Sequence, residues 1–159
     1  VQIKVLMVCL GNICRSPTAE AVFRTKVQTE NLESHILIES AGTGSWHIGE
    51  PPDKRSMQAA IIRDYDMSSQ RARQVSLQDM EEFDYIYAMD KQNLQDLLEM
   101  CAPELQHKIS LFLKQGNSEY EEVPDPYYSG GDGFELVLEL IEEASDSLLS
   151  ALVSRHSLS

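Results

Sequence analysis

Two cysteines and an arginine lie close together near the amino terminus, in the segment Val8-Cys9-Leu10-Gly11-Asn12-Ile13-Cys14-Arg15-Ser16-Pro17. The apolar run at residues 3–8 predicts a buried strand, and Ser16 followed by Pro17 predicts the N-cap and first residue of a helix. The connecting loop therefore joins the carboxyl end of a strand to the amino end of a helix, where backbone N–H groups and the helix dipole favour an anion. A cysteine there, close to the permanent cation of Arg15, is expected to be ionised near neutral pH. This combination predicts phosphoryl transfer through Cys9.

Other chemistry for these residues is less well supported. A lone cysteine at the end of a buried strand is more often a small core residue, but the adjoining glycine, arginine and helix start favour a reactive one. Cys9 and Cys14 could instead bind a metal, yet structural zinc takes four ligands, and the chain adds only Cys101 and four scattered histidines. No lysine completes a Walker loop, and the turn at residues 42–44 lacks the third glycine of a dinucleotide site. We therefore expect neither a metal nor a cofactor.

The Cys-x5-Arg-Ser segment resembles the signature of the low-molecular-weight protein tyrosine phosphatases. A second element of that family's pattern, Asp-Pro-Tyr-Tyr, occupies residues 125–128. Both elements, in a chain of 159 residues, make a match that covers nearly the whole sequence. The resemblance implies a phosphatase that hydrolyses phosphotyrosine and small aryl phosphate monoesters through a phosphocysteine intermediate, with acid phosphatase activity.

Three side chains are expected to carry this reaction. Cys9 would attack phosphorus, and the planar fork of donors on Arg15 would bind two phosphoryl oxygens. Asp125 would protonate the leaving group and then accept a proton from the hydrolytic water. The remaining phosphate ligands would be backbone N–H groups of the loop, from Leu10, Gly11, Asn12, Ile13, Cys14 and Arg15. We expect phosphate and related oxyanions to bind there as inhibitors.

Ser16, Asn12 and Ser40 are expected to support the loop. The resemblance implies that the Ser16 hydroxyl hydrogen-bonds the Cys9 sulfur. It also implies that polar neighbours hold Asn12 in a strained backbone geometry, which asparagine tolerates better than most residues. Family members place a histidine before an Arg-Ala-Arg-Gln element where this chain has Ser69. The resemblance therefore leaves open how the loop is braced here.

The resemblance further implies a crevice deep enough for a phosphotyrosine ring, with walls formed by Ile13, Trp46, His47, Tyr127 and Tyr128. Related arginine phosphatases carry a threonine at the position of Ile13. An apolar residue there fits an aryl phosphate better than a guanidinium phosphate. The expected partners are thus phosphotyrosine proteins or aryl phosphates.

Cys14 lies five positions after Cys9, in the same loop. We expect it to capture oxidised Cys9 as a reversible disulfide and so to protect it from further oxidation. Two other functions stay open at this point. One is a thiol-dependent arsenate reductase, which would need further cysteines, and the other is a non-catalytic phosphotyrosine-binding module.

Composition narrows the setting in which the protein works. The net charge is −13, from 13 basic and 26 acidic side chains, which argues against nucleic-acid and anionic-membrane partners. No apolar run approaches the roughly 20 residues of a membrane helix, and no signal-peptide pattern opens the chain. Three cysteines cannot all pair within the chain, and a reactive thiol needs reducing surroundings, so a cytoplasmic location is expected. We expect a monomer or a weak dimer.

The rest of the chain alternates strands and helices. Strands are predicted at residues 3–8, 35–40, 84–89 and 108–112, and helices at 17–31, 52–63, 93–100 and 134–153. This pattern predicts one α/β domain over residues 1–156, a three-layer sandwich in which helices cover both faces of a four-stranded parallel twisted sheet, with residues 157–159 as a frayed tail. The architecture is Rossmann-like, and the resemblance implies its phosphotyrosine phosphatase I-like form. Because ligands bind at the carboxyl ends of such strands, Cys9, Ser40 and Asp125 are expected just past strand ends, at one edge.

Overall fold

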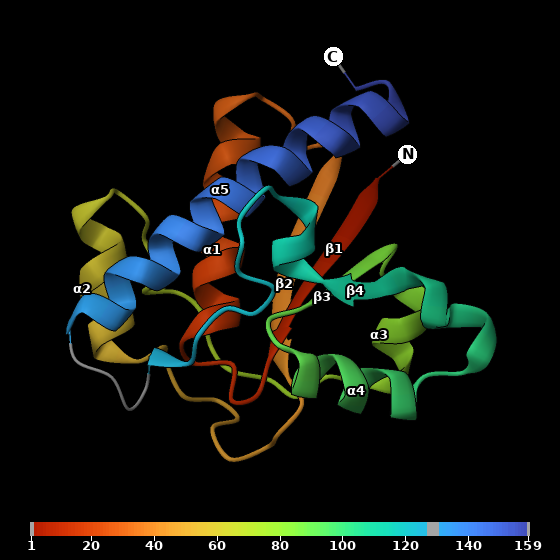
Figure 1. The fold of residues 1–159 in the computed structure, drawn as a ribbon, viewed down its shortest axis with the longest axis horizontal. Helices are drawn as coiled ribbons and strands as arrows, with labels where there is room; N and C mark the ends of the chain where they lie inside the picture. Colours follow the sequence, from red (N-terminus) through yellow and green to blue (C-terminus); the bar gives the residue numbers. More distant parts are fainter. Residues whose placement is uncertain (1, 127–130, 159) are drawn as a thin grey trace.

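The computed structural model describes residues 2–126 and 131–158. Four parallel strands form one sheet in the order β2-β1-β3-β4. Their bounds are Ile3–Cys9 for β1, Ile36–Gly42 for β2, Tyr85–Ala88 for β3 and Ile109–Leu111 for β4. The predicted parallel sheet of a single α/β domain is therefore confirmed (Figure 1).

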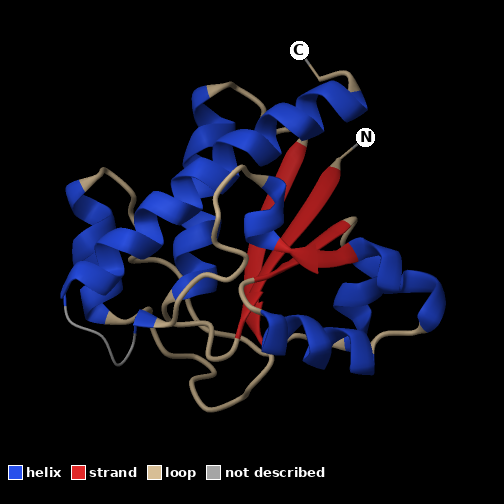
Figure 2. Ribbon diagram, in the orientation of Figure 1, coloured by secondary structure: helices blue, strands red, loops and turns tan. Residues whose placement is uncertain are grey.

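Five α-helices in the described residues surround the sheet. They are α1 (Arg15–Thr29), α2 (Lys54–Ile62), α3 (Leu77–Glu82), α4 (Lys91–Met100) and α5 (Gly131–His156). Helices α1, α2 and α5 lie on one side of the sheet, and α3 and α4 lie on the other (Figures 1 and 2). None of these helices is long and apolar enough to cross a bilayer.

Three short helical segments were not predicted: α3 and the 3₁₀ segments η1 (Pro103–Lys108) and η2 (Phe112–Gln115). Segments of four to six residues complete too few turns for hydrophobic periodicity to reveal them. Helix α3 depends instead on a local capping box, in which Ser76 and Asp79 bond each other's backbone N–H groups.

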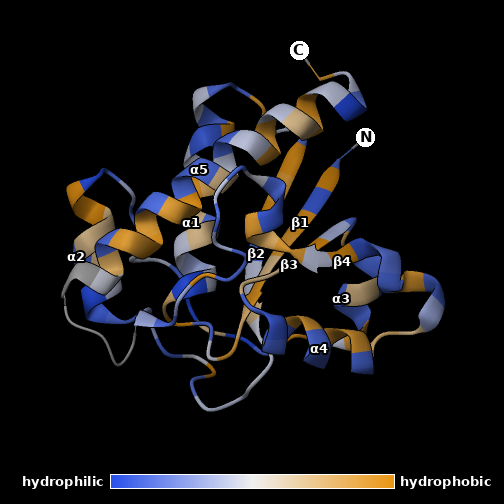
Figure 3. Ribbon diagram, viewed as in Figure 1, coloured by the Kyte–Doolittle hydropathy of each residue, from blue (hydrophilic) through white to orange (hydrophobic). Residues whose placement is uncertain are grey.

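Strand β1 is buried on both faces, which explains its nearly continuous apolar sequence. Ile3, Val5 and Met7 pack in the core cluster that includes α1 and α5, whereas Leu6 and Val8 pack in the cluster that includes α4. Figure 3 shows these apolar strands between helices of mixed hydropathy. The position of the end of β1, where Cys9 lies, is therefore fixed by one core cluster on each face of the sheet.

The carboxyl ends of the strands meet at one edge, where the loops gather (Figure 2). Two expectations for this edge are wrong: Ser40 lies inside β2 rather than past its end, and Asp125 lies well beyond the end of β4, with η2 between them. Strand β2 continues to Gly42, which pairs with Cys9 of β1 and forms an isolated bridge with Gln74. The longer strand brings Ser40 alongside β1, so its side chain approaches the cysteine loop from the side.

The predicted start of α1 is also wrong. Cys14, rather than Ser16, occupies the N-cap position, and its side chain makes no capping hydrogen bond. Ser16 and Pro17 are the second and third residues of the helix. Pro17 is still within the first turn, where backbone N–H groups lack intrahelical partners, so its ring costs no hydrogen bond. The Ser16 hydroxyl is consequently available for the cysteine sulfur.

We predict that Gly42→Ala displaces the cysteine loop. A Cβ at this position would lie 2.7 Å from the Leu10 carbonyl oxygen, and backbone atoms cannot move aside as a side chain can. The free energy of unfolding should fall by about 1–3 kcal/mol, and the KM for phosphomonoesters should rise. Gly116→Ala is the control, because its Cβ would meet only the flexible end of the Glu143 side chain. Equal effects of the two substitutions on KM would contradict this prediction.

Candidate active site

The Cys9 sulfur is hydrogen-bonded to two groups close to it in the sequence. The Ser16 hydroxyl lies 3.0 Å from Sγ, and the backbone N–H of Asn12 donates to Sγ at 3.3 Å. The Cys9 side chain is almost fully buried. These two contacts fix the position of the sulfur at the base of the loop.

Asn12 joins the loop to three other segments. Its backbone is left-handed, with φ of 58°, a conformation that asparagine adopts more readily than most residues. Its Nδ2 group donates to Ser16 Oγ at 2.8 Å and to Ser40 Oγ at 3.0 Å, and its Oδ1 accepts the Arg73 backbone N–H at 3.0 Å. Both amide hydrogens and the amide oxygen are therefore used, which fixes the orientation of the side chain.

This network runs on to Glu20 and avoids Ser69. Ser40 Oγ donates to Glu20 Oε1, and Glu20 Oε2 accepts from Arg24 at 2.6 Å. Ser69, the residue at the family histidine's position, is exposed. Because a carboxylate only accepts, Ser40 donates to Glu20 and accepts from Asn12. The same polarity makes Ser16 an acceptor from Asn12 and leaves its own hydrogen for the Cys9 sulfur or the Ala41 carbonyl oxygen, 3.3 Å away.

Arg15 is a buried cation at the start of α1, with only 4% of its side chain exposed. Its Nη1 group donates to Asp90 Oδ2 at 2.6 Å and to the Val123 carbonyl oxygen at 3.1 Å, and its Nη2 group lies 3.8 Å from Asp125 Oδ2. Burial by itself lowers the pKa of Arg15, but the charges of Cys9, Asp90 and Asp125 and the hydrogen bond to Asp90 raise it, and the net shift is upward. Arg15 thus remains a cation despite its burial.

A cavity of about 330 Å³ opens over this loop. It is lined by Cys9, Leu10, Gly11, Ile13, Cys14, Arg15, Trp46, His47 and Asp125. The structure therefore brings the predicted nucleophile, clamp and acid together with much of the predicted crevice wall. Tyr127 and Tyr128, the other predicted wall residues, lie outside the described residues.

The wall of this cavity is partly apolar and partly open. Trp46 is 70% exposed at its rim. His47 lies against the loop, since a Cβ on Gly11 would be 3.1 Å from its Cδ2 atom, and its Nδ1 is 3.1 Å from Glu50 Oε2. In residues 2–126 and 131–158, no group of three His, Cys, Asp or Glu side chains is arranged to hold a metal ion.

Cys14 differs from Cys9 in its surroundings. Burial raises the pKa of the Cys14 thiol to about 12, with further increases from the charges of Asp53, Cys9 and Asp125, against a lowering by the hydrogen bond to Ser56. Cys14 is therefore a neutral thiol at physiological pH. Cys101, the third cysteine, belongs to the core cluster on the other side of the sheet from the one that contains Cys9.

Two acidic residues of the site were missed in the sequence. Asp90 follows β3 closely, and the rule that directed attention to strand ends could have found it. Its Oδ1 also accepts the Asn93 N–H at 2.7 Å and so caps α4. No such rule points to Glu20 in the sequence, because this residue lies inside a helix and joins the hydrogen-bond network only through Ser40.

Comparison with known proteins decides the family. The profile of the family described as "Low molecular weight phosphotyrosine protein phosphatase" matches residues 4–158. The chain belongs to this family. It is a phosphoric monoester hydrolase, as are its relatives named low molecular weight protein-tyrosine-phosphatases. One of them, YfkJ of Bacillus subtilis, is 43% identical over 151 residues, which cover 94% of this chain and 96% of YfkJ.

Solved structures agree with this assignment. A protein tyrosine phosphatase from Entamoeba histolytica, with Hepes in its active site, superposes with a TM-score of 0.93 at 38% identity, covering 99% of this chain and 100% of that one. An arginine phosphatase from Drosophila superposes with a TM-score of 0.87 at 36% identity and covers 99% of each chain. The fold of this family thus includes enzymes named for two different substrates.

We predict that Asn12→Ala lowers both stability and activity, because it removes the hydrogen bonds of the side chain as well as the preference of asparagine for a left-handed backbone. The substitution removes one hydrogen bond each from Ser16 and Ser40 and leaves the Arg73 N–H without its Asn12 partner, at a cost of about 1–3 kcal/mol in unfolding free energy, and it lowers kcat/KM. Asn31→Ala is the matched control, because Asn31 has φ of 59° but is exposed. Chemical denaturation and steady-state kinetics should separate the two variants. A loss of stability and activity in Asn31→Ala as large as that in Asn12→Ala would refute a bracing role.

Proposed function

We propose that this enzyme hydrolyses phosphotyrosine and small aryl phosphate monoesters through a phosphocysteine on Cys9. Arg15 binds the phosphoryl group, and Asp125 acts first as general acid and then as general base. The observation that carries this proposal is that one cavity is lined by a hydrogen-bonded sulfur, a buried guanidinium and a carboxylate 3.8 Å from that guanidinium.

The loop is suited to hold a phosphate because its carbonyl groups are engaged elsewhere. The carbonyl oxygens of Cys9, Leu10 and Ile13 accept the N–H groups of Thr43, Gly44 and Asp53, each within 2.8–2.9 Å. This leaves backbone N–H groups of the loop, at the start of α1, for the phosphoryl oxygens. Such donors act most strongly on the transition state, in which charge spreads over the equatorial oxygens. Phosphate and other oxyanions are then competitive inhibitors.

An aryl substrate fits this cavity better than a guanidinium phosphate. Ile13, Trp46 and His47 offer an apolar and aromatic lining above the phosphate loop. A planar phenyl ring gains from this contact, whereas a charged guanidinium would lose hydration beside Ile13, which offers it no hydrogen bond in return.

The position of Cys101 on the other side of the sheet favours a phosphatase over an arsenate reductase, because a disulfide cannot easily pass from Cys9 to a cysteine so placed. A reducing compartment, the cytoplasm, suits a protein with three free cysteines.

The assignment is tested by comparing Cys9→Ser and Asp125→Ala with the parent on phenyl phosphate, phosphotyrosine peptides and phosphoarginine, with arsenate reduction as a separate assay. Cys9→Ser should remove turnover, and Asp125→Ala should lower kcat/KM for phenyl phosphate by about 10²–10⁴, because the phenolate then leaves unprotonated. Cys101→Ser is the control and should retain parental activity. Turnover of phenyl phosphate by Cys9→Ser at the parental rate would overturn the mechanism, and a preference for phosphoarginine would overturn the substrate class.

We propose further that Cys14 protects oxidised Cys9. Peroxide converts the Cys9 thiolate to a sulfenic acid, and the Cys14 thiol displaces hydroxide from it, giving the Cys9–Cys14 disulfide and water. Because burial raises the pKa of Cys14 to about 12, this step should accelerate as the pH rises above neutrality. Cys14→Ser should recover less activity than the parent after peroxide followed by dithiothreitol. Equal recovery of the two proteins would exclude the protective role.

A further inference from the structure

The segment that presents Asp125 is attached to the strand–helix corner after β3. Val123 is buried, its N–H donates to the Met89 carbonyl at 2.8 Å, and its own carbonyl accepts from Arg15 at 3.1 Å. These two bonds hold the backbone two residues before Asp125. The Asp125 side chain itself is 41% exposed. Its position in the cavity therefore depends on how firmly the preceding residues are held.

A third attachment comes from a side chain. Glu122 Oε2 accepts the backbone N–H of Lys91 at 2.9 Å. Lys91 is the first residue of α4, so its N–H is one of the helix-end donors that have no partner within the helix. The N-cap residue, Asp90, accepts another of them, the Asn93 N–H. Two carboxylates thus share the positive end of α4, one from its N-cap residue and one from the segment before Asp125.

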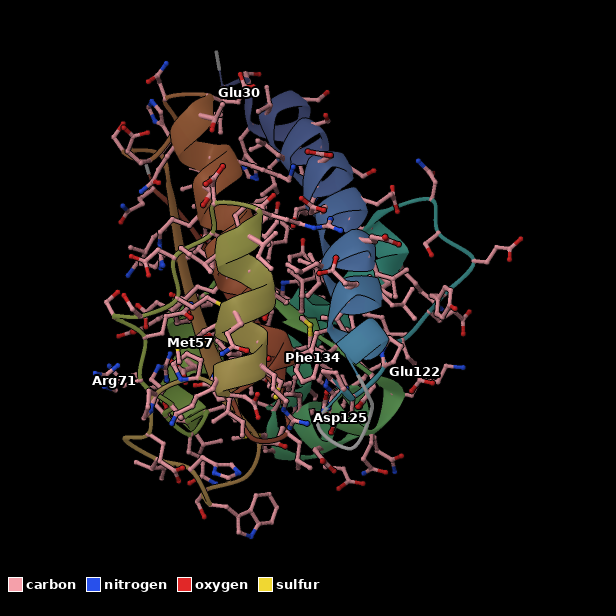
Figure 4. All side chains as sticks on the ribbon, turned by 90° about the vertical axis from the view of Figure 1, so that its left-hand side faces the viewer. Glu30, Met57, Arg71, Glu122, Asp125 and Phe134 are labelled. Atoms are coloured by element: carbon pink, nitrogen blue, oxygen red, sulfur yellow. The ribbon has the colours of Figure 1, made fainter. Side chains whose placement is uncertain are left out.

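The same end of α4 also holds the arginine. Asp90 uses Oδ1 for the helix and Oδ2 for Arg15. A single helix end is therefore bonded both to the residue that binds phosphate and to the segment that carries the acid. Figure 4 shows Glu122 and Asp125 at the same end of the molecule, far from Glu30.

We propose that Glu122 is a positioning residue for the general acid, which it places relative to the Arg15-bound phosphate through the amino end of α4. This inference rests on the role proposed for Asp125. A misplacement of a catalytic group by about 1 Å can cost up to 10²-fold in rate, so one attachment near the acid can affect turnover strongly. Glu122 is not among the residues that line the cavity, so it would act on turnover through Asp125.

The neighbouring ion pairs contribute less to this positioning. Glu121 pairs with Lys91 Nζ at 2.9 Å and lies 4.0 Å from Lys114 Nζ, and these side chains are 50–59% exposed. Glu122 is exposed as well, but its partner is a fixed backbone donor, so only one flexible side chain has to be held in place, whereas each ion pair must hold two. Removing the Lys91 side chain should therefore matter less than removing that of Glu122.

The test compares two substrates that differ in their need for an acid. Phenyl phosphate releases a poor leaving group and depends on protonation, whereas p-nitrophenyl phosphate releases a good one. Glu122→Ala should lower kcat/KM for phenyl phosphate by about tenfold and for p-nitrophenyl phosphate by less than about twofold. Glu122→Gln keeps an oxygen that can accept the Lys91 N–H and should restore most of the phenyl phosphate activity. Lys91→Ala should stay within about twofold of the parent on both.

Two controls separate positioning from other effects. Glu30→Ala removes the same charge at the far end of the molecule and should leave both substrates unchanged. In an Asp125→Ala background, Glu122→Ala should have no further effect on phenyl phosphate, because the group that it positions is absent. Equal losses on the two substrates, or an undiminished loss in the Asp125→Ala background, would overturn the proposal. If Asp125→Ala itself shows no selective loss on phenyl phosphate, the assignment of the acid fails instead.

Discussion

A buried guanidinium is the constraint on which the rest of this site depends. Arg15 is nearly inaccessible to solvent, and a charge in that position is tolerated only if it is paired and hydrogen-bonded. Asp90 and the Val123 carbonyl supply those bonds, so the end of β3, the start of α4 and the segment before Asp125 must all converge on Arg15. The arrangement that lets the protein keep this cation also brings Asp125 to the cavity over the cysteine loop.

The Cys9 sulfur is held in a different way, by a chain of hydrogen bonds in which the direction of each bond is determined by the one before it. Glu20 can only accept, so Ser40 donates to it, Asn12 donates to Ser40 and Ser16, and the Ser16 hydrogen is left for Cys9 or the Ala41 carbonyl. Such a chain functions only when every member is satisfied. Arg24 bonds the far end of Glu20 and the Arg73 backbone bonds Asn12. These bonds show how the loop is braced in a chain that carries an exposed serine at the family histidine's position.

Sequence patterns predicted the elements that depend on local structure, but they did not predict contacts between residues far apart in the chain. The four strands and the strand–loop–helix around Cys9 could be predicted because apolar periodicity and a turn residue suffice for them. The start of α1 was displaced by two residues: Cys14 is the N-cap, and the Ser16 hydroxyl lies beside the sulfur instead of capping the helix. Asp90 and Glu122 carry no motif of their own. Asp90 could have been noticed from its place just after β3, but its contact with Arg15 and the contact of Glu122 with the start of α4 are tertiary contacts that spacing along the chain does not reveal.

The net charge of −13 and the charges of the site together explain how an anion binds to an acidic protein. Distant acidic groups act weakly on a bound phosphate, because salt screens exposed charges beyond about 8 Å at physiological ionic strength. Within the site, Arg15 is already paired with Asp90 and lies near Asp125, so its positive charge is largely balanced before substrate arrives. Much of the attraction for phosphate must therefore come from groups that carry no net charge: the loop N–H groups and the amino end of α1. Such dipoles are fixed by the backbone, and the course of the backbone in this loop depends on the left-handed conformation of Asn12 and on the close approach of Gly42.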